Sequence, residues 1–266
     1  MYRREPSSKP LWQRHWSCPS NAPAQPAETA IAPVAAPWAP RRHVLNDLLK
    51  CVQLIVFVVF MGTEITEFVE GLAAPAPAPN TSNPYYDSLL RDNLSAYLGQ
   101  LAERPGARLM LVGEALGYRG GSQTGIPFSS TRLLKTAPHR FLKQLKPHLH
   151  LSGNDAEGTA SALWQFLAGR QRIPLCWNAY PFHPHRAGEQ NSNRTPTARE
   201  LAWGLDVLDR MMAIWKPDAV IAVGNAAGRA TRSVASKVPT WQVRHPSHGG
   251  RREFLEGMAA AYRHHW

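Results

Sequence analysis

Four short apolar runs, separated by segments long enough to be helices, constrain the fold of this chain more than any other feature. The runs cover residues 108–113, 173–177, 219–224 and 240–243, and helical patterns cover residues 85–101, 159–170, 197–215 and 252–262. Short apolar runs that alternate with helices are typical of a parallel sheet covered on both faces. The sequence therefore predicts an α/β fold, a three-layer α/β/α sandwich around a short, mostly parallel sheet of about four strands.

The sequence upstream of this pattern has a different character. Residues 1–40 are dominated by Pro, Ala and Ser, which favours disorder, and residues 73–84 read as a proline-spaced linker. We therefore expect an N-terminal extension, disordered or of low complexity, over residues 1–83, and a folded domain over residues 84–266 that is sufficient for activity.

A short hydrophobic segment, LIVFVVFM at residues 54–61, interrupts this extension. It lies in an uncharged run of 13 residues, from Cys51 to Thr63, whereas a membrane-spanning helix needs about 20. A short buried strand or helix and a membrane anchor are both open interpretations. A third is that the true start of the protein lies downstream of this region.

Charge and cysteine content narrow the class of partner. Residues 84–266 hold 23 Lys and Arg against 13 Asp and Glu, which favours a polyanion such as nucleic acid, although composition does not separate it from a small phosphorylated ligand. Cys18, Cys51 and Cys176 form no C-x-x-C pair, so neither a disulfide framework nor a four-thiolate cluster is expected. This cysteine usage fits a reducing, cytoplasmic location.

Chemically useful side chains follow the predicted strands. Glu114 follows the first run, Asn178 the second and His245 the fourth, while Phe128 closes the glycine-rich loop after the first. Parallel sheets bind ligands at the carboxyl ends of their strands. An acid, an amide, an imidazole and an aromatic ring are therefore expected to meet at one edge of the sheet.

These residues resemble the motifs of the uracil-DNA glycosylase superfamily. GEALGYRGGSQTGIPF at residues 113–128 is similar to its first motif, Asn178 and the NRTPTARE stretch at 193–200 to its central motifs, and HPS at 245–247 to its closing motif. The resemblance covers about residues 85–265. Leu116 and His248 stand where many members have proline, and the cysteines of the iron–sulfur branch are absent from the sequence.

The resemblance implies a monofunctional enzyme that flips uracil out of DNA and hydrolyses its glycosidic bond without a metal or other cofactor. Glu114 and His245 would be catalytic, the first orienting water and the second stabilising charge on the base. The base would be bound by Ala115, Gly117, Tyr118, Phe128 and Asn178. Tyr118 is displaced by one position from the family's thymine-excluding tyrosine.

DNA would be held by residues that flank the motifs, namely Ser129, Ser130, Arg132, Ser247, His248, Arg251 and Arg252. Arg132 could equally be a solvated surface charge, and Arg251 could fill the gap that the flipped base leaves. We expect a monomer that binds uracil-containing DNA and no membrane. Two other functions remain open: a non-catalytic module that binds uracil or abasic DNA, and a small-molecule hydrolase on the same scaffold.

Two histidines outside these motifs, His183 and His185, invite comparison with a zinc site, because imidazoles at positions i and i+2 can share a metal. Pro184 lies between them and no third ligand is close in sequence. A structural role in a loop is the favoured interpretation.

Overall fold

A parallel four-stranded sheet forms the centre of the domain. The computed structural model describes residues 61–104 and 108–265, which belong to the second of two compact units of the chain. The strands are β2 (Leu109–Ala115), β3 (Leu175–Tyr180), β5 (Ala219–Val223) and β6 (Thr240–Val243), in the spatial order β3-β2-β5-β6. Every neighbouring pair is parallel. This confirms the predicted fold class.

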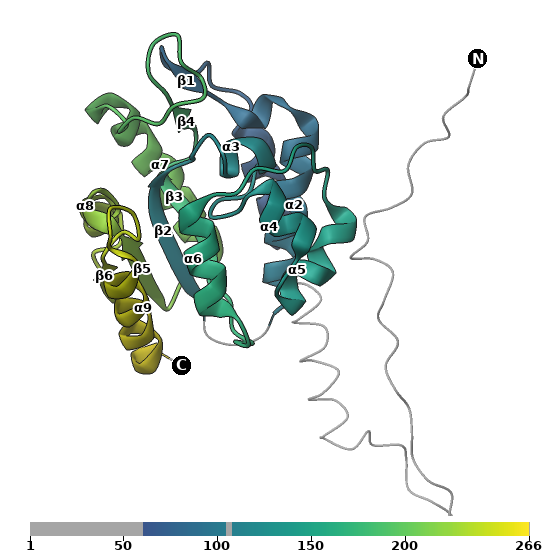
Figure 1. Ribbon diagram of the computed structural model, residues 1–266. Helices are drawn as coiled ribbons and strands as arrows, with labels where there is room; N and C mark the ends of the chain where they lie inside the picture. Colours follow the sequence, from purple (N-terminus) through teal and green to yellow (C-terminus); the bar gives the residue numbers. More distant parts are fainter. Residues whose placement is uncertain (1–60, 105–107, 266) are drawn as a thin grey trace, which may run out of the picture. The chain divides into compact units, whose positions relative to one another are not determined.

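Helices cover both faces of the sheet (Figure 1). On one face α7 (Ala198–Trp215) and α8 (Gly224–Val234) contact each other, and on the other α6 (Gly158–Leu167) contacts α9 (Arg251–His265). β3 and β5 are buried at every position because both faces of the sheet are covered, whereas the edge strand β6 is buried only at Val243. The remaining helical elements are α2 (Ser88–Ala102), η2 (Pro84–Tyr86), α3 (Gly121–Thr124), α4 (Thr131–Thr136), α5 (Arg140–Leu145) and η3 (Lys146–His148).

Local sequence explains where the longest helix, α7, begins and ends. The Thr197 side chain accepts a hydrogen bond from the Glu200 backbone N–H, and the Glu200 carboxylate accepts one from the Thr197 backbone N–H, which is a capping box. The helix ends at Lys216, which adopts a left-handed conformation, and Pro217 follows.

The folded unit begins upstream of the predicted boundary at residue 84. Residues 61–71 are helical, and Met61, Ile65, Phe68, Val69 and Leu72 are buried in the main core. The Phe68 ring packs edge-on against Trp177 of β3, with 5.4 Å between ring centroids. This apolar spacing at one face of a helix gives residues 61–72 a core position rather than a place in a linker. The predicted domain boundary is therefore too late.

The predicted hydrophobic segment at 54–61 lies outside the described residues except for Met61. No helix among residues 61–104 and 108–265 is long and apolar enough to span a bilayer.

A small second sheet was not predicted. Its strands β1 (Thr81–Ser82) and β4 (His183–Pro184) pair antiparallel. Two-residue strands leave no period in the sequence, so pattern analysis has nothing to detect. The pairing fixes the chain before α2 against the segment that follows β3.

Candidate active site

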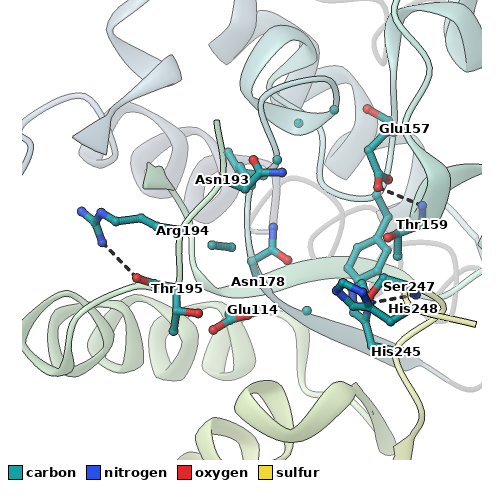
Figure 2. Close-up of a pocket in the computed structure, with 18 residues that line it drawn as sticks. Glu114, Glu157, Thr159, Asn178, Asn193, Arg194, Thr195, His245, Ser247 and His248 are labelled. Atoms are coloured by element: carbon teal, nitrogen blue, oxygen red, sulfur yellow. Dashed lines mark hydrogen bonds between the residues drawn. The ribbon is translucent and has the colours of Figure 1, made fainter. Parts of the chain in front are cut away.

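A cavity of about 550 Å³ opens at the carboxyl ends of the sheet strands (Figure 2). Figure 2 shows Asn178 between two groups of side chains, with Asn193, Arg194 and Thr195 on one side and His245, Ser247 and His248 on the other. The cavity is lined by Gly113, Glu114, Ala115, Leu116, Gly117, Gly120, Gly121, Phe128, Ser129, Glu157, Thr159, Asn178, Asn193, Arg194, Thr195, His245, Ser247 and His248. The predicted convergence of acid, amide, imidazole and aromatic ring is therefore present.

The amide and the aromatic ring meet across a glycine. Asn178 on β3 is in register with Gly113 on β2. A Cβ atom on Gly113 would lie 2.4 Å from Asn178 Oδ1 and 2.7 Å from Phe128 Cζ, far inside van der Waals contact. Glycine is therefore required here by close approach, and it lets a flat ring and an amide sit side by side.

The backbone of Phe128 is held by a hydrogen bond from a neighbouring helix. Its backbone is left-handed, with φ of 54°, a conformation that non-glycine residues seldom adopt. The Trp164 Nε1–H of α6 donates a hydrogen bond of 3.0 Å to the Phe128 carbonyl oxygen. This bond, formed by a buried tryptophan, helps to stabilise the unusual backbone conformation and orients the ring toward the cavity.

The Asn178 side chain is buried, with 3% of its surface exposed. No hydrogen bond joins its carboxamide to another described residue, and its polar atoms are not among the fully buried ones that lack a partner, so they face the cavity. A buried amide normally has partners. Asn178 thus presents one donor group and one acceptor to whatever enters the cavity.

Glu114 stands at the end of β2, half-buried. Burial raises the pKa of its carboxyl group, because the charged form loses solvation, and the positive charge of Arg229 opposes this shift. The carboxylate is therefore poorly solvated and positioned to interact with water or with a developing positive charge.

His245 follows β6, and its proton position is set by Ser247. The Ser247 backbone N–H donates to Nδ1 at 3.2 Å, and the Ser247 hydroxyl lies 2.7 Å from the same nitrogen. Because Nδ1 accepts, the neutral ring carries its proton on Nε2. Burial lowers the pKa of His245, while Glu157 opposes and Arg244 and His248 assist the shift. The ring is thus a neutral donor.

Several cavity residues had no predicted role. The Glu157 carboxylate accepts hydrogen bonds from the backbone N–H groups of Thr159 (2.8 Å) and Ala160 (2.6 Å), which caps α6. An acidic residue directly before an apolar helical run is a recognisable capping signal. It could have located the helix start but not the neighbouring active site.

Asn193, Arg194 and Thr195 belong to the motif stretch noted in the sequence, and the structure gives them contacts. The Tyr118 backbone N–H donates to Asn193 Oδ1 at 3.0 Å, which ties the loop after β2 to this stretch. Arg194 forms two 2.7 Å bonds to the Glu200 carboxylate. Burial alone would raise the pKa of Glu200, but hydrogen bonds from Arg194, Thr197 and Thr81 outweigh it and lower the pKa to about 2.

The predicted base-binding and DNA-binding residues divide into two groups. The cavity includes Ala115, Gly117, Ser129, Ser247 and His248. It does not include Tyr118, Ser130, Arg132, Arg251 or Arg252. The Tyr118 ring lies under the guanidinium of Arg119, 5.1 Å from ring centroid to Cζ.

Two of the three serines that were predicted to bind DNA, Ser129 and Ser130, are almost completely buried, whereas Ser247 is exposed. The Ser129 hydroxyl donates to the Ile126 carbonyl at 2.7 Å and lies 2.6 Å from the Thr124 hydroxyl. Ser130 caps α4, accepting from the Leu133 N–H at 3.4 Å. Their hydroxyls are used inside the protein, so the structure favours a structural role over phosphate binding.

The three predicted arginines are exposed. Arg132 donates to the Asn154 carbonyl at 3.2 Å, Arg251 contacts the Gln165 side chain, and Arg252 lies 3.9 Å from Glu256. Exposed contacts of this kind are weak enough to be exchanged for a phosphate. A role of these arginines in DNA binding stays a prediction.

His183 and His185 make local structural contacts, and His183 lies in the short strand β4 rather than in a loop. The His183 ring nitrogens lie 2.9 Å from the Leu116 carbonyl and 3.0 Å from the Gln190 carbonyl, and His185 Nδ1 lies 3.0 Å from the Arg186 carbonyl. Across residues 61–104 and 108–265, no group of three or more His, Cys, Asp or Glu is placed to hold a metal ion.

The fold and the cavity define a class: an α/β protein with an aromatic ring, an amide, a carboxylate and a neutral imidazole at one sheet edge. The family described as the uracil DNA glycosylase superfamily matches residues 101–263. This chain belongs to that superfamily, a family of DNA glycosylases.

Among solved structures, the chain is similar in fold to wild-type SMUG2 of Pedobacter heparinus. The TM-score is 0.58 at 11% sequence identity, and the match covers 77% of this chain and 97% of that one. A sequence comparison with curated proteins gives no match.

Proposed function

We propose that this protein excises uracil from DNA by hydrolysing the bond between the base and its sugar. The observation that carries the proposal is the unbonded carboxamide of Asn178 beside the ring of Phe128. A base flipped out of a duplex needs a flat surface to stack on and polar groups that match its Watson–Crick edge.

The chemistry of the amide supports uracil over cytosine. Asn178 Nδ2 can donate to uracil O4 while Oδ1 accepts from N3–H. Cytosine presents a donor at position 4 and an acceptor at N3, so the same amide would leave buried groups unpaired. An unpaired buried polar group costs about 1–3 kcal/mol, which favours uracil.

Bond cleavage places negative charge on the base and positive charge on the sugar. His245, neutral with its proton on Nε2, can donate a hydrogen bond to uracil O2 as that charge develops. Glu114 can orient the attacking water and, as an anion, stabilise the cationic sugar. Both roles fit the cavity positions of the two side chains.

The test is incubation of the full chain with labelled single- and double-stranded oligonucleotides that contain one uracil, followed by alkali, which cleaves abasic sites. We expect excision by the parent and single-turnover rates about 10²–10³-fold lower in Glu114→Gln and His245→Ala, with binding nearly unchanged. Glu67→Gln, an exposed carboxylate on the helix at residues 61–71, is the matched control.

Base selectivity is tested in the same assay. Asn178→Asp should lose uracil excision and admit some cytosine, since a protonated or water-bridged carboxyl can present the pattern that cytosine needs. Strands that the parent binds but leaves resistant to alkali would identify a binding module. Equal rates in the parent, Glu114→Gln and His245→Ala would refute the mechanism.

A further inference from the structure

A second cavity adjoins the candidate active site. Its volume is about 680 Å³, and its lining is mostly apolar. Arg194 lines both cavities, so the two share a wall. The second cavity is lined by Pro75, Ala76, Pro77, Ala78, Pro79, Asn80, Tyr180, Phe182, Arg194, Thr197, Arg199, Glu200 and Trp203.

One wall of this cavity is aromatic. Trp203, partly exposed on α7, stacks on Phe182 with 4.9 Å between ring centroids and 28° between planes. Tyr180 meets the same indole edge-on at 6.2 Å and 82°. Phe182 and Tyr180 are buried and hold the indole in one orientation. A fixed indole at the edge of a cavity is a stacking surface that needs little ordering when a ligand binds.

The opposite wall is the proline-spaced segment at residues 75–80, and it is tied to the domain. Arg194 Nη2 donates to the carbonyl oxygens of Pro79 (3.3 Å) and Asn80 (3.1 Å). The Tyr86 hydroxyl donates to the Pro75 carbonyl at 2.9 Å. Hydrogen bonds at both ends, together with the restricted backbone of proline, form the wall before any ligand arrives.

The charge around this cavity favours an anionic ligand. Its carboxylate, Glu200, is already occupied by Arg194, the Thr197 N–H and the Thr81 hydroxyl. Arg199 is an exposed cation at the cavity. An aromatic surface next to a guanidinium matches a nucleobase and its phosphate.

We propose that the second cavity binds an unpaired base of the substrate strand, contributed by a nucleotide adjacent to the flipped one, with Arg199 on its phosphate. Because Arg194 lines both cavities, they are adjacent, and a nucleotide next to the flipped one lies within reach of the second. The inference rests on the proposed function in that it requires DNA at the first cavity. It predicts a preference for single-stranded or locally unpaired substrate.

The test measures binding without cleavage. The probe is a fluorescein-labelled single strand with a central tetrahydrofuran abasic analogue and ordinary bases on both sides. We expect Trp203→Leu, which retains an apolar contact with Phe182, to weaken binding about 5- to 50-fold. Arg199→Ala should weaken it several-fold and reduce its salt dependence. Arg263→Ala, an exposed cation that lines neither cavity, is the control.

A second set of strands identifies the occupant. Replacing the neighbouring nucleotide by another tetrahydrofuran should weaken binding to the parent when it is on the 5′ side or the 3′ side, but not both. With that nucleotide replaced, Trp203→Leu should cause no further loss of affinity. The proposal would be overturned if the affinity losses from Trp203→Leu and from the second tetrahydrofuran multiplied. It would also be overturned if Trp203→Leu and Arg199→Ala both bound the strand within twofold of the parent. Melting curves check that Trp203→Leu is folded, and Arg199→Ala carries the test if it is not.

This result is separable from the proposed function. The tetrahydrofuran analogue has no base to remove, so an absence of uracil excision would leave the coupling between Trp203 and the neighbouring base unaffected. That combination would mean that the strand is bound as inferred by a protein that removes a different base or none.

Discussion

The two sides of the active-site cavity are built in different ways. The sheet side, formed by Gly113, Phe128 and Asn178, is buried and packed to contact distance. The loop side, from His245 to Arg251, is exposed from Ser247 to Gly249 and includes a left-handed His248 with φ of 51°. The sheet side is thus a closely packed surface of fixed shape, whereas the loop side offers exposed polar groups.

This difference indicates that the sheet side recognises the base and the loop side contacts the phosphates. Close packing restricts where the ring and the amide can lie, and discrimination between similar bases depends on such fixed positions. Contacts to phosphate need charge and reach more than exact geometry, and they carry no sequence information. Changes on the sheet side should therefore affect catalysis and selectivity, and changes on the loop side should affect affinity and its salt dependence.

The largest effect is expected from removing the support of the sheet side. A chain that begins at residue 84 loses five buried apolar side chains of the helix at 61–72, including Phe68 against Trp177. At about 1.5–3 kcal/mol each, their loss matches the total stability of a typical domain, about 5–15 kcal/mol. We expect this truncation to unfold, whereas a chain that begins at residue 57 should melt like the full chain.

Circular dichroism melting and uracil excision check this prediction. Equal melting temperatures and equal turnover for the chains that begin at residues 57 and 84 would show that residues 57–83 contribute nothing to the sheet side.

The next largest effect is expected from one methyl group. In Gly113→Ala the new Cβ would overlap Asn178 Oδ1 and Phe128 Cζ, and displacement of the amide should slow excision by about 10²-fold. Gly99→Ala on α2 is the matched control, because its Cβ would meet nothing within 4 Å and Gly99 does not line the cavity. Single-turnover rates measure both. Similar rates for the two variants would mean that the sheet side adjusts freely and that its packing does not determine activity.

The pH dependence of uracil excision tests Glu114, at the end of β2, and His245, on the loop side, in one measurement. The proposed chemistry needs Glu114 ionised and His245 neutral, so activity should fall as the pH is lowered through their pKa values. Burial raises the first from 4.5 and lowers the second from 6.5. The negative charge of Glu157 raises the pKa of His245. Glu157→Gln, which retains an oxygen to cap α6, should therefore shift the acid limb to lower pH.

Glu67→Gln serves as the control for this profile, since that carboxylate is exposed on the helix at residues 61–71. An acid limb that stays in place or moves to higher pH in Glu157→Gln would assign it to a group other than His245.

The smallest effect is expected on the loop side. Arg251→Ala removes an exposed cation at the start of α9 that contacts Gln165. If Arg251 binds one phosphate, affinity for duplex DNA should fall a few-fold, and the slope of log K against log salt should decrease by about 0.9. Anisotropy titrations at several salt concentrations check this. A large fall in excision with unchanged affinity would instead place Arg251 in the gap left by the flipped base.

The sequence was most informative where the chain is regular. Its four apolar runs correspond to β2, β3, β5 and β6, and the predicted helix at 197–215 corresponds to α7 at 198–215. Glu114 near the end of β2, Asn178 within β3 and His245 two positions after β6 line the cavity together. They meet because parallel strands bring their carboxyl ends to one edge.

Prediction was weakest where a role depends on contacts between distant segments. The linker-like composition of residues 73–84 concealed the fact that Arg194, more than a hundred positions away, bonds to Pro79, Asn80 and Thr81. Ser129 and Ser130 lie next to the motif and were expected to bind DNA. Their hydroxyls form local hydrogen bonds inside the protein. The sequence of a loop does not show which of its side chains are buried.

The sequence by itself determined the strand order along the chain, the polar residues at the strand ends and the basic charge of the domain, since these follow from local pattern and composition. Only the tertiary structure decided that Gly113 must be glycine, that the His245 proton lies on Nε2 and that Trp203 adjoins the site across Arg194. Each of these depends on the distance between atoms of residues that packing brings together, and no local period encodes such a distance.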